Sequence, residues 1–370
     1  MGYKAVTVST RSALNNFLNL PFKIYKDDKN WVAPVKSEIK RILHPKRNPY
    51  FKNATIALFN CYYGNDIRSR VSVVINKIFC EKAKKNIAFF GFFESYNEPD
   101  AVKYLFCEVF KYCSYRKIEK LEGPFNPNHY SELGMLYNRF NASPSFFQTY
   151  NPDYYNSLLK NLGFEIEKVI HTRRSTNSSE HLVEKFGNKI NLSLPGLSVR
   201  SFNLRNFKND LECLRKIFND AFSENWHFVP VSREEYLFSS KYMKFVTPPS
   251  LIQFVEYEGN PVAAIHFVLD INPALKILKG NAGIFKYLKL TNQIKKIDSA
   301  IIFAVGVKKS FRNSKVTQLL FNAAVNTAER FDTLETTWMY DDNKIVNSLA
   351  ERLGLKKDKE FVIYSKNLIN

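Results

Sequence analysis

One stretch of the chain combines basic residues with the pattern of a helix start. Residues 305–320 read V-G-V-K-K-S-F-R-N-S-K-V-T-Q-L-L, and the helical pattern opens at Asn313 and Ser314. The first N–H groups of a helix have no partner within it, and the helix dipole favours negative charge there. Four basic residues stand beside this start: Lys308, Lys309, Arg312 and Lys315. The segment therefore predicts a cradle for a pyrophosphate group.

The cysteines and histidines form no comparable pattern. The six histidines are scattered, and the five cysteines are an odd number without any C-x-x-C pair. Zinc sites and disulfide frameworks depend on such spacings. We therefore expect no metal site, and cysteines that serve as small buried apolar residues in a reducing compartment.

Composition indicates a globular protein of two domains. The chain has 370 residues, 45% of them hydrophobic, and a formal net charge of +19 that is not gathered in any long Lys/Arg tract. That charge suits nucleic acid, an anionic membrane surface or an acidic ligand. No apolar run approaches the ~18 residues that span a bilayer, and the N-terminus MGYKAVTVST has no apolar signal core. A soluble, cytoplasmic protein is expected.

The chain contains an internal repeat. Residues 156–163 read N-S-L-L-K-N-L-G and residues 347–354 read N-S-L-A-E-R-L-G, so both share N-S-L-x-x-x-L-G. Each match is followed by a charged stretch and then an apolar strand pattern. Such self-similarity predicts two copies of one domain, joined where Pro195 and Gly196 punctuate the chain.

Both copies show the same order of predicted elements. In the second copy this order is a strand at 198–204, a helix at 207–222, a hairpin at 251–269, and a strand at 301–307; a helix at 314–330, a strand at 333–340, a helix at 344–353 and a strand at 361–365 follow. The first copy has strands at 5–9, 55–62, 70–76 and 87–93, then a helix at 99–115, a strand at 118–122, a helix at 152–162 and a strand at 167–172.

That doubled order is similar to the tandem form of the GNAT (N-acetyltransferase) superfamily. Further segments resemble one bacterial family of GNAT-like proteins that includes ceramide synthase-type acyltransferases. These segments are N-L-P-F-K-I-Y-K-D-D-K-N-W-V-A-P at 19–34, K-R-N-P-Y-F at 46–51, G-F-F-E at 91–94, G-P-F-N-P-N-H-Y-S-E-L-G at 123–134, Y-N-P-D-Y-Y at 150–155 and E-T-T-W-M-Y-D-D-N at 335–343.

The resemblance implies an α+β fold of two tandem GNAT-like domains, each with a mixed, mostly antiparallel sheet flanked by helices. Residues 1–194 then form a degenerate domain that binds the acceptor or acts as a scaffold, and residues 195–370 form the domain that binds acyl-CoA. The implied reaction needs no metal and moves an acyl group from acyl-CoA to an amine, of the long-chain sphingoid type. The implied donor-binding residues are Val305, Val307, Lys308, Lys309, Phe311, Arg312, Asn313, Ser314, Lys315, Val316 and Asn343.

Acyl transfer needs a polarised carbonyl, a base for the amine and an acid for the leaving thiolate. Backbone N–H groups of residues 304–307 can polarise the carbonyl where the strand splays away from its neighbour. Glu335 is the candidate base. The tyrosine acid of the superfamily is replaced here by Ala350, so Tyr340 and Tyr364 are the candidate acids. His266 is expected to be a core histidine with its hydrogen bonds satisfied.

The first copy lacks the basic loop. After its strand at 87–93 it carries Glu94, Glu98 and Asp100, which repel phosphate. We therefore expect it to hold the amine acceptor or to be a scaffold. The candidate acceptor-binding residues are Asn126, Asn128, Glu132, Tyr154 and Tyr155.

Residues 272–298 form an insertion that alternates bulky apolar residues with lysines. This composition fits a helix on an anionic membrane surface or over an acyl chain, and equally an ordinary amphipathic helix. Peripheral contact with the inner membrane surface is thus one expectation. The basic residues considered for it are Lys276, Lys279, Lys286, Lys289, Lys295 and Lys296.

Two alternatives to the acyl-CoA-dependent enzyme stay open. A tandem GNAT enzyme that uses aminoacyl-tRNA also suits a chain of charge +19. A non-catalytic protein that binds nucleic acid or lipid suits the departures from the superfamily pattern, namely Asn313 and Lys315 at glycine positions and the replaced tyrosine.

Overall fold

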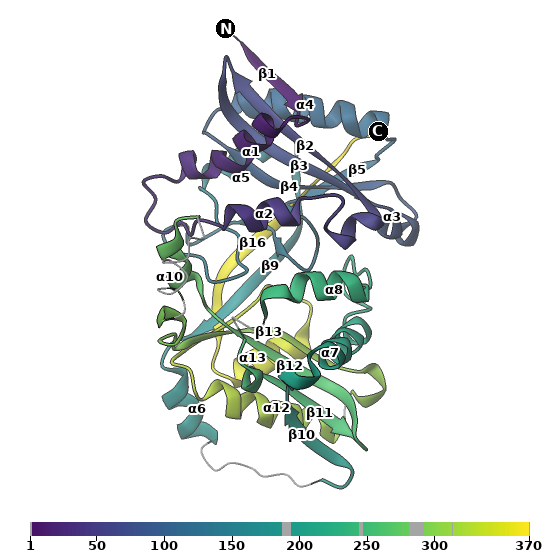
Figure 1. Ribbon diagram of the computed structural model, residues 1–370, viewed down its shortest axis with the longest axis vertical. Helices are drawn as coiled ribbons and strands as arrows, with labels where there is room; N and C mark the ends of the chain where they lie inside the picture. The colour runs from purple at the N-terminus through teal and green to yellow at the C-terminus, as the bar shows by residue number, and fades with distance from the viewer. Residues whose placement is uncertain are drawn as a thin grey trace. The chain divides into compact units, whose positions relative to one another are not determined.

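The computed structural model (Figure 1) describes residues 2–186, 194–243, 247–280, 290, 292–312 and 314–369. The chain divides into two compact units. Unit 1 comprises residues 1–170, 275–287 and 359–370, and unit 2 comprises residues 171–274 and 288–358. The units therefore do not follow a single cut through the chain.

The first repeat supplies most of unit 1. Its elements are β1 (Tyr3–Thr7), α1 (Arg11–Ile24), α2 (Lys36–Ile42), β2 (Ala54–Tyr63), β3 (Asp66–Asn76), α3 (Lys77–Ala83), β4 (Ile87–Ser95), α4 (Pro99–Tyr115), β5 (Lys120–Gly123), β6 (Phe125–Asn126), β7 (Glu132–Leu133), β8 (Met135–Leu136), α5 (Tyr154–Asn161) and β9 (Glu165–Ser175). Helix α6 (Ser178–Phe186) follows.

The second repeat supplies most of unit 2 and has the same order. Its elements are β10 (Leu197–Ser201), α7 (Phe207–Ala221), α8 (Arg233–Ser239), β11 (Ile252–Tyr257), β12 (Asn260–Leu269), α10 (Asn272–Leu275), β13 (Ser299–Val307), α12 (Lys315–Ala328), β14 (Thr333–Thr336), β15 (Met339–Tyr340), α13 (Lys344–Arg352) and β16 (Lys356–Asn367).

Each unit is built on a mixed sheet that is mostly antiparallel. The strand order is β1-β2-β3-β4-β5-β16 in unit 1 and β9-β14-β13-β12-β11-β10 in unit 2. The pairs β4–β5 and β13–β14 are parallel, whereas β2, β3, β11 and β12 pair antiparallel with their neighbours. The predicted fold class is confirmed.

The last strands of the two repeats are exchanged. In unit 1, β16 of the second repeat pairs with β5, with Tyr364 opposite Gly123. In unit 2, the end of β9 of the first repeat pairs with β14, with Arg174 opposite Glu335. The boundary between residues 194 and 195 separates the two sequence repeats. Each repeat nevertheless contributes its final strand to the unit that is built mainly from the other repeat.

The repeated N-S-L-x-x-x-L-G motif has the same structural role in both units. Asn156 donates to the carbonyl oxygen of Leu136 at 3.0 Å, and Asn347 donates to the carbonyl oxygen of Tyr340 at 2.8 Å. The motif glycines follow helices α5 and α13 with φ angles of +77° and +80°, a conformation that glycine adopts without steric cost. The internal repeat is therefore a structural one.

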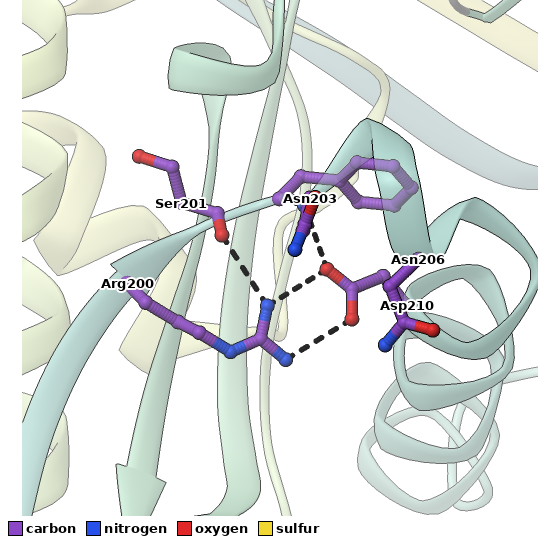
Figure 2. A pocket seen from close by; sticks show the side chains of 6 residues that line it. Arg200, Ser201, Asn203, Asn206 and Asp210 are labelled. Atoms are coloured by element: carbon purple, nitrogen blue, oxygen red, sulfur yellow. Dashed lines mark hydrogen bonds and ion pairs between the residues drawn. The ribbon is translucent and has the colours of Figure 1, made fainter.

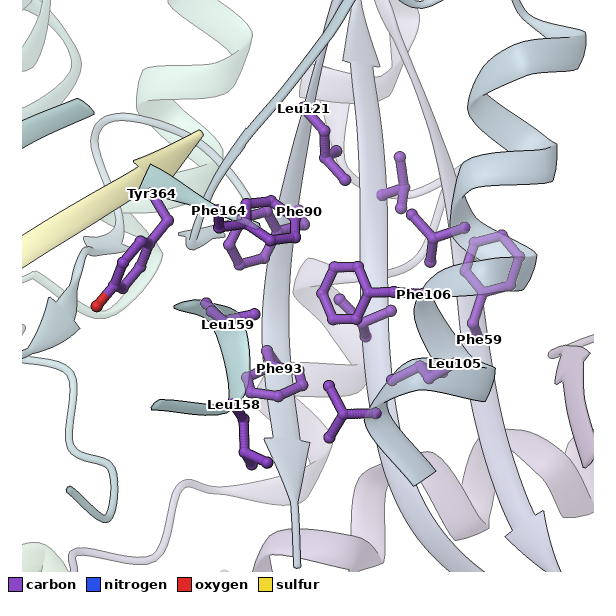
Figure 3. Packing of buried hydrophobic residues seen from close by; sticks show 14 of the residues in the cluster. Phe59, Phe90, Phe93, Leu105, Phe106, Leu121, Leu158, Leu159, Phe164 and Tyr364 are labelled. Carbon is purple, nitrogen blue, oxygen red and sulfur yellow. The ribbon is translucent and has the colours of Figure 1, made fainter. Parts of the chain in front are cut away.

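Apolar periodicity explains how helices cover these sheets. In unit 1, α4 buries Val102, Leu105, Phe106 and Val109 against a core rich in phenylalanine (Figure 3). In unit 2, α7 packs through Leu211, Leu214, Ile217 and Phe218 on a cluster that contains strand residues Ile252, Phe254 and Ala264. Helix α12 also contacts β11 and β12.

The insertion at 272–298 is described only in part. It begins with α10 and a short 3-10 turn at Lys276–Leu278. Within unit 1, the Lys276 ammonium donates to Ser143 Oγ and to the carbonyl oxygen of Lys29, both at 3.0 Å. Lys286 and Lys289 lie outside the described residues, so the predicted membrane-facing helix is untested. Among the described helices, none has the length and apolar character needed to cross a membrane.

Candidate functional site

In unit 2, strands β13 and β14 separate. Their parallel pairing runs from Ser299 opposite Thr333 to Ile302 opposite Thr336. Beyond that point the Thr337 hydroxyl donates to the carbonyl oxygen of Phe303 at 3.0 Å. Strand β13 continues to Val307, and among the described strands only β12 pairs with its residues 304–307. The predicted opening is confirmed, and it leaves one backbone edge of β13 without a strand partner among the described residues.

The opening coincides with an irregularity in β13. The register with β12 shifts between His266 and Phe267, where His266 faces Ala304 and Phe267 faces Ile302. Phe303 is therefore the extra residue of a β-bulge, a feature that bends a strand and redirects its groups. Three residues after this bulge, Gly306 lets α7 approach closely, because a Cβ there would lie 2.9 Å from Phe218 Cδ1 and 3.1 Å from Ala221 Cβ.

The loop after β13 forms a capped helix start, as predicted. A 3-10 turn, Lys309–Phe311, leads to Ser314, whose hydroxyl accepts from the Val316 N–H at 3.2 Å and caps α12. The backbone N–H of Lys309 donates to Asp220 Oδ2 at 2.6 Å, which ties the loop to the C-terminal end of α7. Asn313 lies outside the described residues.

The four cations of this loop have different partners. Glu224 lies 3.1 Å from both Lys309 Nζ and Arg312 Nη1, and hydrogen bonds from these two groups lower its pKa. Arg312 also donates to the carbonyl oxygen of Ala221 at 2.8 Å. Lys308 and the exposed Lys315 have no carboxylate partner among the described residues. These two are the cations best placed to meet a bound anion.

The candidate base and one candidate acid lie in unit 2. Glu335 is only 2% exposed on β14, and its carboxylate accepts from Arg174 Nη1 at 3.0 Å. Tyr340 on β15 is buried beside Trp338 and Trp226, and burial raises its pKa. A carboxylate that can take up a proton and a phenol that can give one are the groups that acyl transfer needs as base and acid.

Two other predicted residues have structural roles. Tyr364 belongs to unit 1, where it is fully buried in the core and donates to Asn156 Oδ1 at 2.9 Å. Asn343 caps α13, because its side chain accepts from the Val346 N–H at 3.3 Å. The structure therefore places Tyr364 in a unit other than that of Glu335.

His266 departs from its prediction. It is 4% exposed on β12, as a core histidine should be. However, neither ring nitrogen has a hydrogen-bond partner among the described residues. The expectation that its hydrogen bonds are satisfied is wrong.

In unit 1 the corresponding separation of β4 and β5 is filled by the chain itself. The parallel pairing ends at Phe89 opposite Glu122, and a bulge in β4 follows. Gly91 then packs directly on the backbone of Phe125 in β6. The Asn126 side chain accepts from the Phe92 N–H at 2.7 Å. In unit 1, β6 therefore occupies the space beside β4 where the pairing with β5 ends.

A buried polar network surrounds Glu94 at the end of β4. Its Oε2 accepts from the hydroxyls of Tyr25 and Tyr155, both at 2.8 Å, and its Oε1 lies 3.6 Å from Arg70 Nη2. Burial raises the pKa of Glu94, and the Arg70 charge opposes that shift. Tyr154 donates to the Ser95 carbonyl oxygen at 2.9 Å.

Sequence reasoning treated Glu94 only as a charge that repels phosphate. The signal that was missed is a charged residue next to the largely apolar run of each of two neighbouring strands: Arg70 precedes V-S-V-V-I, and Glu94 follows I-A-F-F-G-F-F. These two residues face each other in the β3–β4 register. A lone charge in a buried strand is stable only with a partner.

The remaining acceptor candidates lie next to this network. Glu132 pairs with Asn126 in the β6–β7 register. Glu132 is exposed as a residue, but the protein around its carboxyl group removes water from it and so raises its pKa to about 7. The Glu94 charge raises this pKa further, whereas a hydrogen bond with Asn126 lowers it. Asn128 instead closes a turn, where its Oδ1 accepts from the Tyr130 N–H and the Ser131 hydroxyl, both at 3.0 Å.

A pocket elsewhere in unit 2 is not part of these sites. Figure 2 shows it between β10 and the start of α7, lined by Arg200, Asn203, Asn206 and Asp210 among others. Arg200 makes two hydrogen bonds with Asp210, at 2.7 and 3.1 Å, and one with Glu256 at 2.6 Å. Its guanidinium is thus engaged in holding β10, α7 and β11 together.

Comparisons with known proteins agree with this architecture. No family model matches the chain. The chain is 26% identical to the bacterial ceramide synthase of Caulobacter vibrioides (strain NA1000 / CB15N), covering 98% of this chain and 97% of that protein. It is 24% identical to Protein YghO of Escherichia coli (strain K12), covering 98% and 95%.

Among solved structures, a tandem GNAT protein from the clavulanic acid biosynthesis pathway superposes with a TM-score of 0.58 at 7% identity, covering 100% of this chain and 99% of that one. At that identity the likeness establishes the fold. The chain is therefore a tandem GNAT-fold protein that is similar, over nearly its whole length, to a bacterial ceramide synthase.

Proposed function

We propose that this chain is an N-acyltransferase that moves an acyl group from an acyl-CoA thioester to the amine of a long-chain, sphingoid-type base. The observation that carries the proposal is the full-length similarity to the bacterial ceramide synthase. The fold supports it, because the second repeat combines an open strand edge with a basic helix start.

In this proposal the second repeat binds the donor. Lys308 and Lys315 meet the pyrophosphate at the start of α12, where the N–H groups and the helix dipole also favour negative charge. The free edge of residues 304–307 directs N–H groups at the thioester carbonyl. The donor is thus held on both sides of the opening between β13 and β14.

In the chemical step, Glu335 and Tyr340 transfer the protons. The amine nitrogen attacks the carbonyl carbon, and the C–S bond breaks. Glu335, whose carboxylate accepts a hydrogen bond from Arg174, takes up the proton that the amine loses. Tyr340, kept protonated by its burial, gives a proton to the leaving thiolate.

The first repeat binds the acceptor in this proposal. The carboxyls of Glu132 and Glu94 attract a cationic acceptor to this repeat, and Tyr154 and Tyr155 are the adjacent polar aromatic groups. Asn126 orients Glu132 from the neighbouring strand. Asn128 does not contact the acceptor but stabilises the turn between β6 and β7.

The test is a transferase assay with purified protein, acyl-CoAs of graded chain length and a sphingoid base, read by mass spectrometry of the amide. We expect an N-acyl product and a kcat for Glu335→Gln that falls by about 100-fold, the usual scale for removing a general base. A Glu258→Gln variant, an exposed carboxylate in the turn between β11 and β12, is the control. Retention on tRNA without acyl-CoA binding or amide formation would contradict the proposal and favour the aminoacyl-tRNA or nucleic-acid alternatives.

A further inference from the structure

His266 lies on the face of the unit 2 sheet that α7 covers. In the strand registers it stands opposite Ile252 on one side and Ala304 on the other. Directly opposed residues of neighbouring strands point to the same face. Ile252 belongs to the cluster around α7, and Ala304 packs against that cluster. The imidazole therefore shares this face with α7.

Burial without hydrogen bonds makes this histidine unusual. The residue is 4% exposed, and both Nδ1 and Nε2 lack a partner among the described residues. Its nearest aromatic neighbour is Phe303, with ring centroids 5.1 Å apart. A buried polar group without a partner destabilises a fold, and such groups are rare in native structures. A leucine at this site would avoid that cost.

The unpaired imidazole lies on the strand next to the bulge of β13. Phe303 is the bulge residue of β13, and Ala304, opposite His266, begins the backbone edge that β14 leaves free. The polar side chain without a partner thus stands one strand away from the place where the thioester carbonyl is proposed to bind. Bulges next to active sites commonly serve to aim groups.

We propose that His266 contacts the substrate, and that the protonated nitrogen of its imidazole donates a hydrogen bond to the acyl carbonyl oxygen while acyl transfer takes place. The inference rests on the proposed acyltransferase function and adds a side-chain donor to the backbone donors of residues 304–307. Negative charge develops on that oxygen in the transition state, so a donor aimed at it accelerates the reaction.

The state of the ring favours a donor over a base. Burial lowers the pKa of His266 to about 3. An imidazole with so low a pKa cannot hold a proton taken from an amine, but its remaining N–H still donates. A neutral imidazole can also be buried in the fold without the free-energy cost of burying a charge.

The experiment compares His266→Leu and His266→Gln with the wild type in the amide-forming assay and in thermal unfolding. We expect the leucine variant to melt at a higher temperature than the wild type, because an unpaired polar group is gone, and to lose about 100-fold in kcat, the scale for one donor to an oxyanion. The glutamine variant keeps an N–H donor and should recover part of that loss.

Phe267→Leu is the matched control, because Phe267 is fully buried next to His266 in the chain. It should lower the melting temperature and leave kcat unchanged. A leucine variant with wild-type kcat would overturn the inference, and so would one that melts lower, because it would reveal a structural partner for the imidazole. If the wild type makes no amide, the proposed function fails first, so the two failures are distinguishable.

Discussion

At the scale of single residues, some basic side chains of the loop before α12 have a carboxylate partner among the described residues and others do not. Lys309 and Arg312 share Glu224, whereas Lys315 is exposed and has no carboxylate partner among the described residues. An anion that binds here therefore gains most from Lys315 and competes with Glu224 for the other two.

Opposite changes in affinity follow for two substitutions. Lys315→Glu should weaken acyl-CoA binding by about tenfold or more, which corresponds to about 1.4 kcal/mol. Glu224→Gln should strengthen binding, because it frees Lys309 and Arg312. Titration calorimetry with one acyl-CoA measures both, and Lys216→Glu, an exposed lysine on α7, is the control. Equal affinities for all four proteins would remove the loop from donor binding.

The raised pKa of Glu132 predicts a dependence of stability on pH. The ordinary value is 4.5 and the folded value is about 7, so between these pH values the folded chain binds more protons than the unfolded chain. The free energy of unfolding then falls as the pH rises through this window. Glu132→Gln should reduce that fall, as measured by urea unfolding at pH 5 and pH 8; the raised pKa of Glu94 contributes the part that remains.

The same variant tests the acceptor site. If an ammonium binds beside Glu132, Glu132→Gln should also raise the KM for the amine without changing the KM for acyl-CoA. Glu165→Gln, an exposed carboxylate on β9, is the control for both measurements. A pH dependence identical to that of the wild type would show that the Glu132 carboxyl is not perturbed.

At the scale of elements, the helices α5 and α13 end in the same way. Gly163 and Gly354 both follow their helix with positive φ, where a side chain is strained. The two sites differ in what surrounds them. A Cβ at Gly354 would lie 2.7 Å from the His181 ring, whereas one at Gly163 would meet only the flexible end of Lys366 at 2.7 Å.

Alanine at these two glycines should therefore destabilise the protein unequally. We expect Gly163→Ala to cost about 1 kcal/mol from the backbone conformation alone. Gly354→Ala should cost more, because the His181 ring must also shift. Denaturant unfolding of both variants measures the difference, and equal costs would mean that the ring moves freely.

Local sequence predicted most elements because local patterns specify them. The apolar spacing of 207–222 and 314–330 corresponds to α7 and α12, and the run at 301–307 corresponds to β13. The helix α1 was not predicted, although Phe17, Leu18 and Leu20 form its buried stripe, because Pro21 stands within it and masks the pattern.

At the scale of the whole molecule, the exchange of β9 and β16 makes the two repeats interdependent. Strand β5 has β16 as its neighbour, and β14 has β9. A repeat expressed alone lacks the strand that completes its sheet and exposes an unpaired strand edge, which promotes aggregation.

Fragments cut at the repeat boundary test this interdependence. Residues 1–194 and 195–370 expressed separately should be poorly soluble, whereas the co-expressed pair should copurify and melt cooperatively. A cut in the loop of the β2–β3 hairpin is the control, because it leaves the exchange intact but divides a single sheet. Separate fragments that each fold as stable monomers would contradict the exchange.

The sequence by itself determined the doubled order of elements, the capped basic helix start, and the repeated motif that puts an asparagine in the first turn of α5 and α13 and a glycine after their ends. These features depend on neighbours a few residues apart, so periodicity, capping and turn chemistry reveal them.

Only the tertiary structure decided which strand completes each sheet and that Tyr364 is a core residue of unit 1. It also decided that Glu94 has Arg70 and two tyrosines as partners, and that the His266 ring has no hydrogen-bond partner among the described residues. Each of these depends on groups tens to hundreds of residues apart. Two equivalent final strands fit the same kind of edge in both repeats, so no local pattern distinguishes exchange from its absence. The physical reason is that pairing partners and buried hydrogen bonds are set by long-range packing, which a single strand does not encode.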